Sequence, residues 1–252
     1  MELTLSLIIL TIIAGFFKGL VGFGLSLLLI SVLLSAGISA TELLPILVPL
    51  FVSLDIILFF QNRKFISIDF KENFTLHPYT LMGIFLSILL GTYLLVLINT
   101  EYLKLSFAIL ILISLFFLIE KVDLHQMKIP SEKENLGFGL ISGFLTGMFT
   151  MNAIPVSLYL IYNQYPKDKY MGSLVTFLLI TDLLLIAVYL FKNLFTFNGF
   201  LISLQLIGIV IVGFIIGSYA RKHLSSSHFK SFVILILALT SLKIIFEFFI
   251  GF

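Results

Sequence analysis

The chain of 252 residues has no cysteine and no tryptophan, and it has few charges: 15 Lys and Arg and 13 Asp and Glu. Without cysteine there is no disulfide framework, no thiolate metal site and no cysteine nucleophile. A soluble domain is about one-quarter charged, whereas here 11% of the residues are charged and 60% are apolar. This composition excludes a soluble enzyme, because too few polar side chains are present to cover a surface that faces water.

The net charge of +2 is too small to imply nucleic-acid binding, so we expect no nucleic-acid partner. The sequence contains no metalloprotease His-Glu-x-x-His, no Walker phosphate loop and no serine-nucleophile elbow. We therefore predict that the protein is not an enzyme and has no metal or cofactor.

Hydrophobic runs recur along the whole chain. A transmembrane helix needs about 20 apolar residues, and six runs have about that length: 43–60, 78–98, 102–119, 170–191, 199–220 and 229–250. Two further runs, 3–34 and 136–163, are too long for one simple crossing, and each contains residues near its middle that loosen a helix. We therefore predict an all-α polytopic membrane protein in which two long helices are broken.

The two broken segments resemble each other, which indicates an internal repeat. Offsets of 128, 127 and 126 residues align three sets of positions: Gly15, Phe16 and Gly19 with Gly143, Phe144 and Gly147; Asp55 with Asp182; and Gly91, Tyr93 and Lys104 with Gly217, Tyr219 and Lys230. We predict two homologous halves, 1–120 and 136–252, which are joined by a polar linker at 121–135.

The positions of the basic residues indicate the orientation of the two halves, because Lys and Arg collect in cytoplasmic loops. If all eight segments cross the membrane fully, the 13 basic residues outside the apolar segments divide 7 against 6. If the broken segments instead enter and leave on one side as re-entrant hairpins, the division becomes 11 against 2. The second arrangement predicts inverted repeats with both termini outside. Kinked full spans stay open as the alternative.

Each break predicts part of a binding site, because irregular backbone at membrane depth is tolerated only inside protein or along a wet cavity. Free amide hydrogens at a broken helix attract an anion. The predicted substrate-binding residues are Lys18, Gly22, Gly24, Ser26, Thr150, Asn152 and Pro155.

The glycines that precede the breaks, and Lys18, have alternative roles. The spacing Gly15-x-x-x-Gly19, repeated at Gly143 and Gly147, also lets helices approach closely, and we favour this packing role for those four glycines. Lys18 would either meet an anion or extend its amine to the membrane interface.

Asp55 and Asp182 occupy matching places in apolar runs, and we predict that they carry coupling protons. The alternative is that each accepts hydrogen bonds from backbone or from a neighbouring Ser or Thr. Lys243 and Glu247 have the i, i+4 spacing of a structural ion pair.

The two glycine motifs also have a family resemblance. The first runs Ala14-Gly-Phe-Phe-Lys-Gly-Leu-Val-Gly-Phe-Gly24, and the second runs Ser142-Gly-Phe-Leu-Thr-Gly-Met148 and on to Pro155. Together they resemble the paired motifs of the sulfite exporter TauE/SafE family, also called the 4-toluene sulfonate uptake permease family. The resemblance implies a bacterial inner-membrane carrier of sulfite, sulfonates or other small organic anions, driven by the proton gradient.

The chain departs from the family pattern in its glycine cluster. In the second half the cluster is replaced by Thr150-Met-Asn152-Ala-Ile-Pro155, which should reshape any site and prevents the substrate from being carried over. We expect a secondary transporter whose site lies between the two broken helices, with an anion channel as the alternative. The expected partners are a small anion, protons and the lipid bilayer, and a homo-oligomer stays open.

Overall fold

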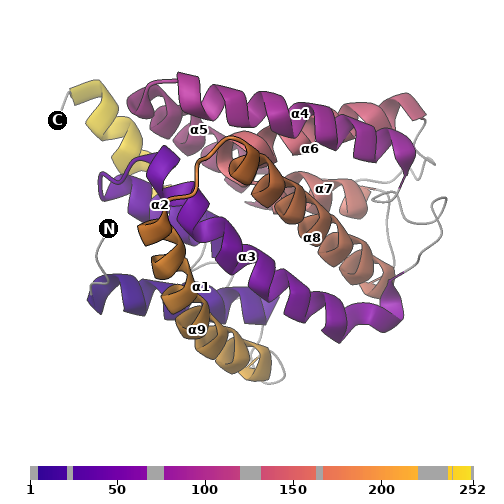
Figure 1. Ribbon diagram of the computed structural model, residues 1–252. Helices are drawn as coiled ribbons and strands as arrows, with labels where there is room; N and C mark the ends of the chain where they lie inside the picture. The colour runs from indigo at the N-terminus through magenta and orange to yellow at the C-terminus, as the bar shows by residue number, and fades with distance from the viewer. Residues whose placement is uncertain are drawn as a thin grey trace. The chain divides into compact units, whose positions relative to one another are not determined.

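The computed structural model describes residues 5–21, 25–66, 77–119, 132–162, 167–220, 238–239 and 241–250. These residues form helices with short connections, and no strand occurs among them. The labelled helices of Figure 1 are α1 (Leu5–Val21), α2 (Leu25–Ser35), α3 (Ala40–Asn62), α4 (Pro78–Leu97), α5 (Thr100–Ile119), α6 (Glu132–Phe149), α7 (Ala153–Tyr162), α8 (Lys167–Phe191) and α9 (Phe197–Ala220). A short 3₁₀ helix, η1 (Arg63–Phe65), follows α3, and residues 241–250 are helical as well.

The helices lie where the hydrophobic runs predict them. Each of the two long runs forms two helices, α1 with α2 and α6 with α7. Of the run 229–250, the part 229–237 lies outside the described residues. Within the described part of the chain, four helices are long and apolar enough to cross a bilayer. The prediction of an all-α polytopic membrane protein is confirmed.

The distribution of side chains on α4 is typical of a helix in lipid. Its buried face carries mostly small or polar residues, including Thr80, Gly83, Ser87 and Gly91. Its exposed face carries large apolar residues: Met82, Phe85, Leu86, Leu90 and Val96. This is the reverse of a helix in water, and it is stable only where the solvent is itself apolar.

The chain forms two compact units, and each unit combines both sequence halves. Unit 1 contains Met1–Leu50, Ile98–Val122 and Leu194–Phe252, and unit 2 contains Phe51–Leu97 and Asp123–Asn193. In unit 1, α1 packs along α9; in unit 2, α4 packs along α6, as Figure 1 shows. This division into two units does not test the predicted sequence halves, because two homologous halves can each contribute helices to both units.

Glycines let these helix pairs approach until their backbones touch. A Cβ on Gly15 or Gly19 of α1 would overlap backbone atoms of Val210 or Phe214 in α9. The packing role predicted for the glycine pairs is therefore confirmed in α1. Both helices run in the same direction, because Gly15 lies opposite Val210 and Gly19 opposite Phe214.

The α4–α6 pair has the same construction. A Cβ on Gly143 of α6 would overlap the backbone of Ile84, and one on Gly147 would overlap that of Ile88. The hydroxyl of Thr92 in α4 also donates to the carbonyl of Gly147 at 3.4 Å. The packing role predicted for this second glycine pair is likewise confirmed.

The two helix pairs correspond under the offsets of the predicted repeat. Gly15 aligns with Gly143 at an offset of 128, and its contact Val210 aligns with Ile84 at an offset of 126. The contacts of Gly19 and Gly147, with Phe214 and Ile88, correspond in the same way. A repeat predicts such matched contacts, and the two homologous halves stay a prediction.

Within unit 2, α7 folds back beside α6. The Tyr159 hydroxyl of α7 donates to Asn135 Oδ1 near the start of α6 at 3.0 Å, and the rings of Tyr159 and Phe138 lie 4.5 Å apart. At about 1.5 Å per residue, α7 is about 15 Å long, or half a bilayer. This geometry favours the hairpin over a kinked full span.

The starts of α6 and α8 lie at the same end of unit 2. Only residues 163–166 separate α7 from α8, and α8 runs about 22 Å from Lys167 before Asp182 meets Asn152 at the start of α7. Helix α8 is therefore antiparallel to α7 and runs in the direction of α6. The end of α3 lies there too, because a Cβ on Gly172 in α8 would overlap the Phe65 carbonyl.

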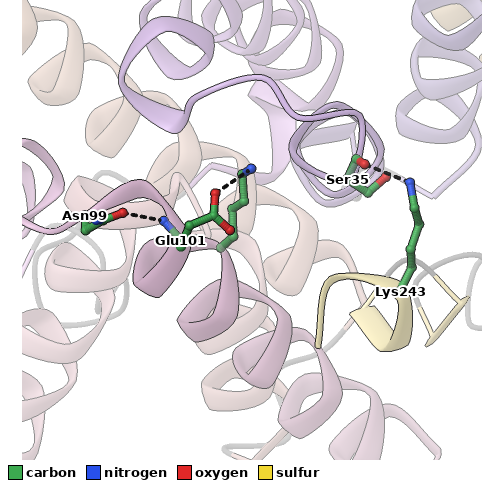
Figure 2. A network of polar contacts seen from close by, with 5 residues as sticks. Ser35, Asn99, Glu101 and Lys243 are labelled. Atoms are coloured by element: carbon green, nitrogen blue, oxygen red, sulfur yellow. Dashed lines mark hydrogen bonds and ion pairs between the residues drawn. The ribbon is translucent and has the colours of Figure 1, made fainter. Parts of the chain in front are cut away.

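In unit 1, the C-terminal end of α2 is capped by Gly37 and Lys243. Gly37 has a φ of +89°, and Ile38 N–H donates back to Leu33 O at 3.2 Å, which completes a Schellman motif. Lys243 Nζ donates to the free Ser35 carbonyl at 2.8 Å (Figure 2). The predicted pair of Lys243 with Glu247 is confirmed at 3.4 Å.

The close contact between α9 and α1 yields a matched pair of variants. We expect Gly217→Ala to destabilise the protein by about 1–3 kcal/mol, because its Cβ would meet the Phe16 backbone. Gly208→Ala, on the same helix with open space around it, should be neutral or stabilising by up to about 1 kcal/mol. Thermal loss of helicity in detergent, followed by circular dichroism, measures both. Equal effects would contradict the packing role of Gly217.

Candidate functional site

The break between α6 and α7 contains Thr150 and Asn152, two of the predicted site residues. Helix α6 ends at Phe149 and α7 begins at Ala153, and all three residues between them are buried. Thr150 N–H donates to Thr146 O at 2.8 Å, and Met151 N–H reaches back to Leu145 O at 3.3 Å. The chain thus reverses direction while these two backbone donors stay satisfied, as burial in a membrane requires.

Thr150 has a backbone conformation that is unfavourable for its side chain. Its φ is +53°, in the left-handed region. Gly37 after α2 and Asn193 after α8 have a positive φ as well, but glycine and asparagine adopt it readily. For a β-branched threonine it costs about 1–2 kcal/mol. Such strain persists where the surroundings impose it, and it collects at functional sites.

Asn152 connects the break to α8. Its side-chain amide Nδ2 donates to Asp182 Oδ1 at 2.5 Å and to Thr181 Oγ1 at 2.9 Å. The Thr181 hydroxyl donates to the carbonyl of Phe177 at 2.9 Å or to that of Leu178 at 3.0 Å, so it accepts from Asn152. Both amide hydrogens of Asn152 are therefore in use, and their acceptors fix the orientation of the side chain.

The carboxylate of Asp182 lies at the N-terminal end of α7. Asn152 immediately precedes this helix, whose first turn has amide hydrogens without intrahelical acceptors and a positive dipole end. Pro155 is buried in that turn and brings no N–H, so donors come from its neighbours. The arrangement suits a negative charge, and the carboxyl of Asp182 lies beside it.

The other predicted residues are distributed as follows. Lys18 is buried in α1 with 4% of its surface exposed, and Asp55 is fully buried in α3. Ser26 is half-buried in α2. Gly22 and Gly24 lie outside the described residues. Unit 1 contains Lys18 and Ser26, whereas unit 2 contains Asp55, Thr150, Asn152, Pro155 and Asp182.

The structure brings together two residues that the sequence assigns to different roles. Asn152 is predicted to bind substrate and Asp182 to carry a proton, yet they share a hydrogen bond. Their partner Thr181 is not among the predicted site residues, although a threonine beside an aspartate in an apolar run was a signal. Among the described residues, no group of three or more His, Asp or Glu side chains could hold a metal ion.

Relief of the strain at Thr150 is measurable. We expect Thr150→Gly to stabilise the protein by about 1 kcal/mol, because glycine adopts a positive φ without cost. Thr146→Gly, one turn earlier in a helical conformation, should destabilise it by about 1 kcal/mol. Chemical denaturation in detergent micelles compares the two. A loss of stability in Thr150→Gly would show that packing of the threonine side chain outweighs its backbone strain.

Comparison with known proteins identifies the family. The family model described as sulfite exporter TauE/SafE matches residues 7–244 of the chain. No curated protein and no solved structure matches. The family match includes both breaks and the whole of α6, α7 and α8. The chain therefore belongs to the sulfite exporter TauE/SafE family and is a multi-pass membrane transporter.

Proposed function

We propose that this transporter carries sulfite, a sulfonate or a related small organic anion across the bacterial cytoplasmic membrane, coupled to protons. One observation carries the proposal: a buried amide and a buried carboxyl, Asn152 and Asp182, meet where a half-length helix begins. Membrane-embedded polar groups of this kind typically mark substrate and proton pathways, and broken helices typically form transporter sites.

Anion contacts are proposed for each break separately. In the second break they are the backbone at Thr150, the Asn152 amide and the first turn of α7 with Pro155. In the first break, Lys18, Gly22, Gly24 and Ser26 are assigned by sequence. Asp55 and Asp182 are the proposed proton carriers, since both are buried carboxyls in apolar helices.

We further propose that the end of unit 2 at which α6 and α8 begin faces the cytoplasm. Exposed basic residues support this orientation: Arg63, Lys64, Lys133 and Lys169 belong to that end, whereas Lys192 follows α8 at the other. The native chain has no cysteine, so a cysteine introduced at Lys169 or at Asn193 reports sidedness to an impermeant maleimide in intact cells. The proposed topology also places both termini outside. Labelling of Lys169→Cys from outside would contradict the proposed orientation.

Flux in proteoliposomes tests the function. We expect sulfite and methanesulfonate to accumulate when the pH is lower outside than inside, with saturation and counterflow. The combined change Asp55→Asn and Asp182→Asn should reduce the gradient-driven rate to the rate without a gradient, because neither site can then take up a proton.

Glu101→Gln is the matched control, because Glu101 is an exposed carboxylate paired with Lys104 at 3.2 Å. It should leave the flux unchanged. Gradient-driven uptake that survives in the double variant would refute proton coupling. Unsaturable flux without counterflow would favour the alternative, an anion channel.

A further inference from the structure

The hydrogen bonds of Asn152 restrict how this site can bind an anion. In the structure both hydrogens of the amide are donated, one to Asp182 and one to Thr181. An anion that binds the Asn152 amide, as proposed, needs one of them. The Thr181 hydroxyl donates to carbonyls of its own helix, α8, and these bonds hold it in place as an acceptor for Asn152. The bond from Asn152 to the Asp182 carboxylate is therefore the one that an anion would replace.

Electrostatics prevents the carboxylate and the anion from sharing the amide. Asp182 is 2% exposed and Asn152 is 4% exposed, so two negative charges in contact there would repel with little screening by water. Like charges that share a buried site favour the protonated form of one of them. A protonated Asp182 is a weaker acceptor for Asn152, and its O–H can donate to an anion oxygen.

We propose that the Asp182 carboxylate and the substrate anion bind the Asn152 amide in turn, so that each anion is carried with one proton in the same direction. This inference rests on the proposed function and deepens it, because it states how Asp182 couples the proton to the anion. The proton moves from water to a carboxylate oxygen of Asp182, and no covalent bond other than O–H changes. One proton enters with each monovalent anion, so the charge of the site is the same empty and loaded and the symport is electroneutral.

The other titratable groups of the elements packed around α8 do not replace Asp182 in this exchange. Asp55 is the second buried carboxyl of the unit and lies on α3. Tyr189, two turns further along α8, is fully buried. The remaining titratable groups whose side chains the structure describes on these elements are Glu132, Lys133 and Glu134 at the start of α6, Tyr159 bonded to Asn135, Tyr79 and Tyr93 on the exposed face of α4, Lys169 and Tyr170 at the start of α8, and Arg63 and Lys64 in η1.

Calorimetry on the purified, full-length protein tests the exchange. Methanesulfonate is the probe, because its charge is constant over the pH range in which carboxyls titrate. Titrations in buffers of different ionisation enthalpy should show uptake of about one proton per bound anion, and affinity should fall about tenfold per pH unit once Asp182 is ionised. Asp182→Asn should bind without proton uptake and without this pH dependence, whereas Glu101→Gln, at an exposed carboxylate, should keep both.

A flux measurement on the unchanged protein gives a second readout that no folding defect can affect. In proteoliposomes, methanesulfonate flux should be independent of a potassium–valinomycin potential. Proton uptake that persists in Asp182→Asn, or binding to the unchanged protein without proton uptake, would overturn the exchange. Voltage-driven flux of the monovalent probe would also overturn it. If neither methanesulfonate nor sulfite binds or crosses, the proposed function itself fails, and this outcome is distinct from the others.

Discussion

A bilayer supplies no water to a broken helix, so each polar group at the break must find its partner within the protein. Unit 2 is organised around this constraint. At the α6–α7 break, the N–H groups of Thr150 and Met151 bond back to α6, and the Asn152 amide bonds to α8. These contacts require α7 to return beside α6 and α8 to run back past the break. The position of Asp182 is thus a consequence of how the break is satisfied.

The close helix pairs α1–α9 and α4–α6 form a packed frame beside each break. In lipid there is little hydrophobic gain from joining two apolar helices, so association depends on close packing. Gly143 and Gly147 bring α6 against the backbone of α4, and Gly15 and Gly19 do the same for α1 and α9. Each glycine-rich helix thereby has a rigid neighbour from the opposite half of the chain. The helices that follow the breaks, α2 and α7, are short and lie beside this frame.

The sequence alone predicts the positions of the helices well, because lipid imposes a minimum length of apolar residues on each crossing. It also identifies Thr150, Asn152 and Asp182 as unusual residues in apolar surroundings. It does not predict their hydrogen bonding, because the contact of Asn152 with Asp182 depends on how α7 lies beside α6, where Tyr159 bonds to Asn135. The left-handed backbone at Thr150 could not be foreseen, since threonine rarely adopts it. Small-residue spacing predicts close packing but does not identify α9 and α4 as the partners.

Membership of the sulfite exporter TauE/SafE family and the buried Asn152–Asp182 pair lead to one central claim: a proton on Asp182 accompanies the anion into the site. The most direct measurement is an infrared difference spectrum of the reconstituted protein, recorded on adding methanesulfonate at constant neutral pH. The account predicts a new carbonyl stretch from a protonated carboxyl in the unchanged protein, and its absence from Asp182→Asn. An anion-induced spectrum of the unchanged protein without a protonated-carboxyl band would contradict the account.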